Sequence, residues 1–130
     1  MVDTITVSIK DLHSYSMAAL ASIGMNKRDA QTIADKLTLT DSWGIFTHGN
    51  KLLGDYITRI QAGGTNPIGK PRIASEGPAW AIVDGDNAAG QIGCDFAMRK
   101  AIDLAKSAGI AYVGVRNTSH FGAAGVYPAM

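Results

Sequence analysis

Cysteine is almost absent from this sequence of 130 residues, with Cys94 as its single example. One cysteine cannot form an internal disulfide, and a thiolate metal clip needs at least two. The first ten residues also lack the apolar segment of a secretory signal peptide. The sequence therefore predicts a reducing compartment, the cytoplasm, and no metal site.

An excess of charge of either sign is also missing. Lys and Arg total 12 and Asp and Glu total 11, which gives a formal net charge of +1. Nucleic-acid-binding domains normally carry a basic excess on one face, so we expect no nucleic-acid partner. No apolar run approaches the ~20 residues of a bilayer-spanning helix, so we expect no membrane partner. The hydrophobic fraction of 46% is too high for a disordered chain.

Charged residues are scarce in total. They make up 18% of the chain, whereas an average soluble domain contains about 25%. A small domain with few charges and many apolar residues often hides part of its surface against a partner subunit or a further stretch of chain. We therefore predict that the isolated chain exposes an apolar patch larger than the few hundred Å² usual for monomers.

Helical patterns dominate the first half of the chain. A short alternating strand is predicted over residues 4–8, and a capping box that begins at Ser8 predicts the first helix. Apolar residues recur at helical spacing over residues 26–44 and again over 50–62. Glycine, proline and asparagine then predict a loop over residues 63–71. This loop is the best candidate boundary between two units.

The second half of the chain changes to a mixed pattern. Residues 71–75 predict an edge strand, and residues 79–83 predict a second short strand before a turn. A helix is predicted over residues 91–107, followed by a buried strand over 110–115. A further helix is expected to begin at Phe121. The fold class predicted for the chain is α+β, with a helical unit over residues 1–70 and a second unit over 71–130.

Two of the three histidines lie in predicted loops. His48 separates two helices, and His120 follows the predicted buried strand. Each comes directly after a hydroxyl residue, and the ends of buried strands commonly line ligand sites. Imidazole titrates near pH 6.5, so either histidine can exchange a proton with a substrate oxygen at neutral pH. His13 lies beside an apolar position of the first helix, where a surface or packing role is expected.

Other chemistries have weaker support. Ser119 and His120 could suggest a hydrolase, but adjacent loop residues rarely align as nucleophile and base, and the Gly-x-Ser-x-Gly motif is absent. Asp84 and Asp86 resemble the start of a calcium loop, but Ala89 occupies the position of its invariant glycine, and a turn is the expected structure. No Gly-x-Gly-x-x-Gly fingerprint of a Rossmann fold follows a strand.

Three blocks of sequence together carry a family resemblance. They are Thr-His-Gly at 47–49 with Tyr56 and Ala-Gly-Gly-Thr-Asn-Pro at 62–67, Val-Asp-Gly at 83–85 with the helix after it, and Val-Arg-Asn-Thr-Ser-His-Phe-Gly-Ala-Ala-Gly at 115–125. In this order they resemble the malate/L-lactate dehydrogenase family of NAD(P)-dependent 2-hydroxyacid oxidoreductases. That family is distinct from the Rossmann-fold lactate and malate dehydrogenases.

The resemblance implies a site and a reaction. The family's paired histidines match His48 and His120, and its active-site tyrosine matches Tyr56, so these three are the expected catalytic residues. One histidine, with His120 preferred, would exchange a proton with the substrate oxygen as hydride moves to or from NAD or NADP. The substrate would be a small 2-hydroxy or 2-oxo acid, and the full enzyme a homodimer. The other expected contacts are Thr47, Lys51, Arg116 and Ser119 for substrate, and His120 and Gly122 for cofactor.

Two departures from the family pattern stand out. Many members have an arginine four residues after the first histidine, suited to a substrate carboxylate; here that position is Leu52, and Lys51 beside it is a possible substitute. Family members are also much longer than this chain. The resemblance therefore implies an N-terminal portion with the beginning of the non-Rossmann cofactor domain over residues 71–130. The alternative is a truncated, catalytically inactive fragment with only an assembly role.

Overall fold

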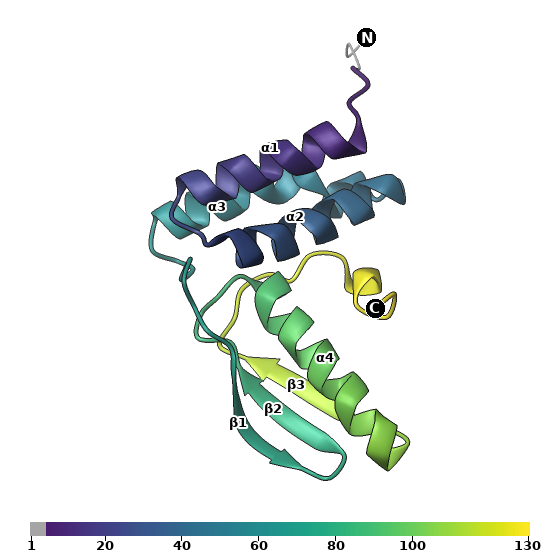
Figure 1. Ribbon diagram of the computed structural model, residues 1–130. Coiled ribbons are helices and arrows are strands. Elements are labelled where there is room, and N and C mark those ends of the chain that lie inside the picture. The colour runs from purple at the N-terminus through teal and green to yellow at the C-terminus, as the bar shows by residue number, and fades with distance from the viewer. Residues whose placement is uncertain (1–4) are drawn as a thin grey trace.

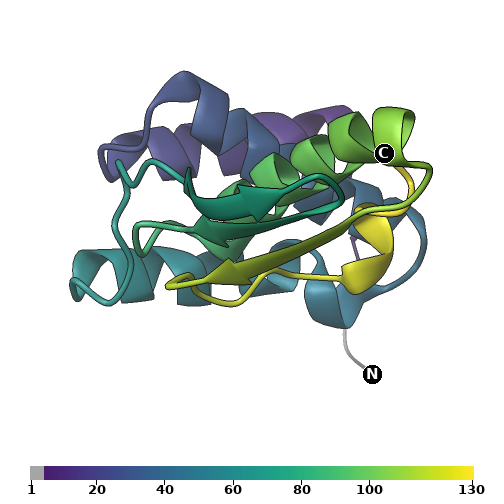
Figure 2. The same cartoon turned by 90° about the horizontal axis from the view of Figure 1, so that it is seen from below.

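The computed structural model describes residues 5–130 and has two layers (Figure 1). Three helices, α1 (Ile9–Ser22), α2 (Lys27–Ser42) and α3 (Leu53–Gln61), pack together in one layer. A small sheet with helix α4 (Gly90–Ala108) forms the other layer, and α4 lies along one face of the strands (Figure 2). This is the α+β arrangement that the sequence predicts.

Helices α1 (Ile9–Ser22) and α2 (Lys27–Ser42) begin where the sequence places their caps. The Ser8 side chain accepts a hydrogen bond from the Asp11 backbone N–H, and Asn26 does the same for Asp29. After α2 come two 3-10 turns, η1 (Phe46–His48) and η2 (Asn50–Leu52), and then α3 (Leu53–Gln61). The third predicted helix is therefore a 3-10 turn that continues as an α-helix.

The sheet has the order β1-β2-β3. Strand β1 (Arg72–Gly77) pairs antiparallel with β2 (Trp80–Asp84), and β2 pairs in parallel with β3 (Tyr112–Arg116). Helix α4 (Gly90–Ala108) makes the crossover between the two parallel strands. Because β2 and β3 are parallel, the carboxyl end of β3 lies beside the amino end of α4. The loop that carries His120 begins there.

One hydrophobic cluster joins the two layers. Leu20, Ile33 and Leu37 from the helical layer are fully or almost fully buried. The cluster also contains Ala88 and Ala89, which come directly before α4, and Ile92 in the first turn of that helix. Because this core crosses residue 70, the division of the chain into units 1–70 and 71–130 stays a prediction.

Three predicted elements are wrong in the structure. Residues 5–8 form no strand, since Ile5 is 86% exposed and no strand lies beside it; Thr4 is outside the described residues. Strand β3 is not buried, because it is an edge strand of the sheet in the described chain and Tyr112 is 68% exposed. The helix expected from Phe121 is only a 3-10 turn, η3 (Ala124–Val126). Gly122 has a φ of +80° and Ala123 is extended, so helical backbone begins only after them.

None of the helices in the described range, residues 5–130, is long and apolar enough to cross a membrane.

Candidate active site

The loop that carries His48 is held by a carboxylate from α2. Asp41 accepts hydrogen bonds from the backbone N–H and the side-chain amide of Asn50, each at 2.8 Å. A side chain at position 49 would collide with Asp41, so glycine is needed for this close approach. The Asn50 amide oxygen also accepts a hydrogen bond from Ser16, which is fully buried on α1. The loop is thus tied to two helices directly beside His48.

Tyr56 reaches the site from the buried face of α3. Its side chain belongs to the hydrophobic cluster and is 9% exposed, so its hydroxyl is the polar end of an otherwise apolar contact. Burial raises the pKa of Tyr56. The Gln91 side chain lowers this pKa and the charge of Asp55 raises it, and the net result is a raised pKa. The phenol therefore keeps its proton at neutral pH and can both donate and accept a hydrogen bond.

The His120 loop runs directly over the amino end of α4. A side chain at position 90 would overlap the carbonyl groups of Ser119 and His120, so Gly90 allows this crossing. The Thr118 hydroxyl donates to the Ala88 carbonyl at 3.0 Å and fixes the loop from the other side. The loop therefore has little freedom at the residue that bears the imidazole.

The turn after β2 holds the start of the same loop. The Asn117 amide donates to the Asp84 carboxylate at 3.1 Å, and Asn117 takes a left-handed backbone with φ of +50°. The hydrogen bonds from Asn117 and from the Asp86 backbone N–H lower the pKa of Asp84. Asp84 is thus an ionised anchor for the loop, and the Asp84–Asp86 segment forms a turn as expected.

These elements bring the three expected catalytic residues together. The Tyr56 hydroxyl and His120 Nδ1 share a hydrogen bond of 2.8 Å. The rings of His48 and His120 have their centroids 5.8 Å apart. Thr47 Oγ1 lies 3.0 Å from His48 Nδ1, so the neighbouring hydroxyl also contacts the pair. In the described chain no hydrogen bond engages Nε2 of His120, whose side chain is exposed. Two imidazoles and a phenol can therefore move a proton to or from a small molecule at this surface.

The remaining expected contacts are less closely tied to this cluster. Lys51 is exposed on η2 and forms no ion pair within residues 5–130, and Leu52 packs against the hydrophobic core. Arg116 lies 3.5 Å from the Asp84 carboxylate, so its charge is already engaged at the end of the sheet. Ser119 is half-buried. Gly122, directly after Phe121, has a left-handed backbone conformation. Their roles in binding stay predictions.

Gln91 is a residue of the site that sequence reasoning missed. It is the second residue of α4 and is only 1% exposed. Neither atom of its amide has a hydrogen-bond partner in the part of the chain that the structure describes. A buried unpaired amide costs about 1–3 kcal/mol. The pattern of helix α4 places Gln91 at its start, but only the fold shows that this position is buried beneath Tyr56 and Gly122.

The described residues do not form the geometry that a hydrolase or a metal site would need. Across residues 5–130 the Ser119 hydroxyl makes no hydrogen bond to His120, and Nδ1 of His120 is engaged by Tyr56, so a serine–histidine pair is not formed. Within the same residues no group of three or more His, Cys, Asp or Glu side chains is placed to hold a metal ion. His13 Nε2 lies 2.7 Å from the Asp35 carboxylate, so His13 contacts a different partner from the other two histidines.

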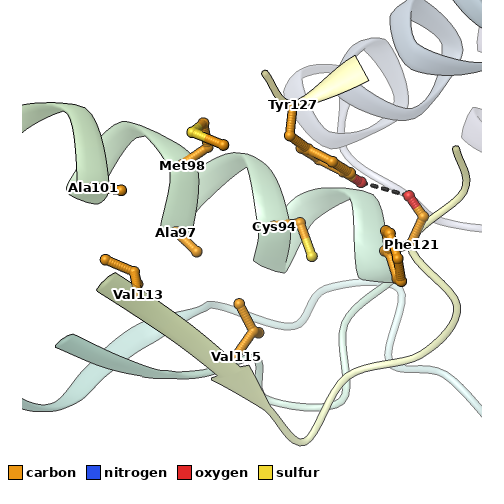
Figure 3. A pocket seen from close by; sticks show the side chains of 8 residues that line it. All are labelled: Cys94, Ala97, Met98, Ala101, Val113, Val115, Phe121 and Tyr127. Carbon is orange, nitrogen blue, oxygen red and sulfur yellow. Dashed lines mark hydrogen bonds between the residues drawn. The ribbon is translucent and has the colours of Figure 1, made fainter. Parts of the chain in front are cut away.

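An apolar groove of about 220 Å³ lies between α4 and β3, next to the site (Figure 3). Cys94, Met98 and Val115 line it, and the Tyr127 hydroxyl donates to the Phe121 carbonyl at one end. Burial raises the pKa of the Cys94 thiol, so the thiol stays protonated at neutral pH. The groove is lined by apolar side chains and the Cys94 thiol, whereas the polar candidate residues are Tyr56 and the two histidines.

An α+β fold that joins a histidine pair to a buried tyrosine defines a protein with an acid–base site at the junction of its layers. Comparison with known proteins specifies the family. The model of the malate/L-lactate dehydrogenase family matches residues 7–130. The chain belongs to this family, as its sequence motifs indicate.

Individual relatives agree with this assignment. The chain is 39% identical over 120 residues to the malate dehydrogenase of Pyrococcus abyssi, and the match covers 92% of this chain and 33% of that protein. It is 37% identical over 117 residues to the ureidoglycolate dehydrogenase (NAD(+)) of Escherichia coli K12, with coverage of 90% and 34%. The chain thus spans about a third of the length of these curated relatives.

Solved structures show the same fold. The malate dehydrogenase of Pyrococcus horikoshii OT3 superposes with a TM-score of 0.95 at 38% identity, over 100% of this chain and 38% of that one. The sulfolactate dehydrogenase of Methanocaldococcus jannaschii superposes with a TM-score of 0.92 at 34% identity, over 95% and 36%. The predicted α+β class is therefore confirmed for the described residues.

Proposed function

We propose that this chain supplies the acid–base residues of an oxidoreductase that transfers a hydride between NAD or NADP and a small 2-hydroxy or 2-oxo acid. The observation that carries the proposal is the cluster of Tyr56, His48 and His120, drawn from three different parts of the chain. Membership of a family whose relatives are dehydrogenases by name supports the same reaction class.

The residues around His120 fit a bound nicotinamide cofactor. The His120 side chain is exposed, and Phe121 beside it has its ring centroid 6.0 Å away and is 40% exposed. Gly122 adds no side chain at this point. His120 and Gly122 would therefore border the cofactor, which when bound supplies hydride to the substrate carbon or accepts it from there.

His120 then handles the proton at Nε2. In the direction of reduction, the N–H bond at Nε2 breaks and the proton goes to the carbonyl oxygen, so no free alkoxide forms; in oxidation the neutral ring takes the proton back. General acid–base catalysis of this kind contributes roughly 10²–10⁴ in rate. Tyr56 orients the ring through Nδ1, and His48, with Thr47, faces the same space. Ser119 and Lys51 complete the proposed substrate contacts, and the Lys51 ammonium would attract the substrate carboxylate. Arg116 would contact the substrate only if its ion pair with Asp84 opened.

We also propose that the working enzyme is a homodimer in the cytoplasm. Trp43, Ile45 and Phe46 support this, because these apolar side chains are 43%, 43% and 65% exposed and lie directly before His48. Burial against a second copy would remove them from water. Light scattering coupled to size-exclusion chromatography measures the mass, and a monomer at micromolar concentration with no apolar dye binding would contradict this part.

The test of the function compares three histidine variants of the chain. NADH and NADPH binding is followed by fluorescence, and turnover is measured with malate, L-lactate, sulfolactate and ureidoglycolate as hydroxy-acid substrates. We expect His120→Asn to lower kcat roughly 10²–10⁴-fold, and His48→Asn to lower it as well, whereas His13→Asn is the matched control on the outer surface. Equal turnover in all three variants would show that the site is wrong. If neither cofactor binds and no acid is turned over, the assembly role becomes the better interpretation.

A further inference from the structure

A second cavity, of about 830 Å³, lies on the opposite side of helix α4 from the apolar groove. Its walls are the beginning of α2, the loop over residues 68–71 and one face of α4. The α4 residues that line it recur at helical spacing from Ile92 to Asp103, whereas those of the groove lie on the other face, from Cys94 to Ala101. Ligand pockets usually measure about 300–1,000 Å³, so this cavity has the size to hold a small molecule.

Two of the three carboxylates that line this cavity form ion pairs with the protein itself. Asp95 lies 2.8 Å from the Lys36 ammonium and 2.7 Å from the Arg99 guanidinium. Asp103 lies 2.9 Å from the Lys106 ammonium. Because their charges are balanced in this way, these two acids would repel a bound anion only weakly.

Two cations of the cavity, in contrast, have no acidic partner within residues 5–130. Arg28 comes from the first turn of α2, and Lys70 comes from the loop over residues 68–71. The third carboxylate, Asp29, lies beside Arg28 in the chain but accepts its hydrogen bond from the Asn26 amide at 2.6 Å. The unpaired charge at this cavity is therefore positive and comes from two separate segments. Guanidinium and ammonium groups both bind carboxylates and phosphates.

The cavity also has an apolar part. The Phe96 side chain is 37% exposed and Ile68 is 64% exposed, although both are large and hydrophobic. Ile92, which is 8% exposed, connects the cavity to the hydrophobic cluster of the core. Aromatic rings pack favourably against one another in offset or edge-to-face contacts. A ligand with a flat ring would therefore cover Phe96 and remove apolar surface from water.

We propose that this cavity binds a small organic anion with a planar ring, whose charged group lies at Arg28 and Lys70 and whose ring packs against Phe96. The ligand is an aromatic carboxylate or a nucleoside monophosphate, since each carries an anion and a flat ring within the available volume. None of the described residues that line the cavity belongs to the cluster of Tyr56 and the two histidines, so this binding is independent of the proposed reaction.

The experiment is an NMR titration of the whole chain, with the methyl signals of isoleucine as the readout. The probes are benzoate, adenosine 5′-monophosphate and inorganic phosphate, which carries charge without a ring. We expect benzoate or adenosine 5′-monophosphate to shift the signals of Ile68 and Ile92 to saturation, whereas Ile102, outside the cavity lining, should not respond. Inorganic phosphate should bind about tenfold more weakly or less, because it leaves Phe96 uncovered. The tighter of the two ringed anions identifies whether a carboxylate or a phosphate is recognised.

Variants of the exposed lining residues test the two parts of the cavity. Arg28→Met and Lys70→Met should each raise the Kd several-fold, and the double variant should raise it about tenfold or more, since each removes a charge that faces the anion. Lys27→Met is the matched control, because Lys27 is the neighbour of Arg28 and lies outside the cavity lining. Phe96→Leu should weaken binding of the ringed anions and leave the binding of inorganic phosphate unchanged.

The proposal is overturned if neither ringed anion shifts Ile68 and Ile92 to saturation, if inorganic phosphate binds as tightly as they do, or if the double variant keeps the wild-type Kd. Shifts centred on His120 and Gly122 would place the anion at the candidate active site and would overturn it as well. A failure of the proposed function appears instead as turnover that does not depend on His120, and it leaves these titrations unchanged.

Discussion

The Tyr56 hydroxyl lies 2.8 Å from Nδ1 of His120, although 64 residues separate the two in the chain. Tyr56 comes from the helical layer, and His120 comes from the loop after the last strand. The contact therefore exists only when the two layers are packed correctly. Within the described residues it leaves Nε2 of the exposed His120 side chain without a hydrogen-bond partner.

Replacement of Tyr56 by phenylalanine removes this contact and little volume. We expect kcat to fall about tenfold or more, since part of the acid–base contribution of roughly 10²–10⁴ depends on a fixed imidazole. KM should stay nearly constant, because the hydroxyl lies behind the ring. Steady-state kinetics of Tyr56→Phe beside Tyr15→Phe, an exposed tyrosine on α1, makes the comparison. A wild-type kcat in Tyr56→Phe would contradict the orienting role.

The crossing at Gly90 offers a second test. A methyl group at this position would overlap the carbonyl groups of Ser119 and His120, so Gly90→Ala must move the loop or the start of α4. Overpacking of this kind costs about 1–3 kcal/mol, and the His120 ring should lose its contact with Tyr56. Gly54→Ala is the matched control, because a Cβ at that helical position meets open space. Urea unfolding and the NMR signals of His120 measure the two effects, and equal behaviour of both variants would show that the crossing is not tight.

The ion pair between Lys36 and Asp95 links α2 to α4 and predicts a dependence of stability on pH. Their charged atoms are 2.8 Å apart, and both side chains are largely buried. Burial alone would raise the pKa of Asp95, but hydrogen bonds from Arg99 and Lys36 outweigh it and lower the pKa below its ordinary value. A lowered carboxyl pKa adds stability that is present above the unfolded value of 3.8 and is lost as the pH falls through the folded value.

Lys36→Met should therefore destabilise the chain by about 2 kcal/mol at pH 7, as expected for loss of a hydrogen bond to a charged group. The difference from the wild type should shrink as the pH falls below 3.8 and through the lowered pKa of Asp95, because Asp95 then becomes neutral in both proteins. Lys106→Met, which breaks an exposed pair with Asp103, should change the free energy of unfolding by less than about 0.5 kcal/mol. Urea titrations at pH 7 and pH 3 measure these differences, and a loss that is equal at both values would rule out the ionic explanation.

Local patterns predicted most of the helices and strands. Ser8 and Asn26 cap their helices because a short polar side chain satisfies free backbone N–H groups at the first turn, whatever the rest of the chain does. The outcome at residues 5–8 and at Phe121 was different. An alternating pattern makes a strand only when a neighbouring strand is present, and the left-handed Gly122 delays helical backbone. These two predictions were wrong because they depend on tertiary partners and on backbone conformation, and neither can be read from local periodicity.

The sequence by itself determined the family and the fold class, and it predicted the three candidate residues for proton transfer, because Tyr56, His48 and His120 lie in motifs with a fixed order. Only the tertiary structure decided how they meet: His120 reaches Tyr56 because Gly90 lets its loop cross α4, and Asp41 ties down the His48 loop. The burial of Gln91 could not be predicted from the sequence for the same reason. Burial and hydrogen-bond pairing are properties of side chains brought together from distant positions, and no local pattern records which neighbours they will have.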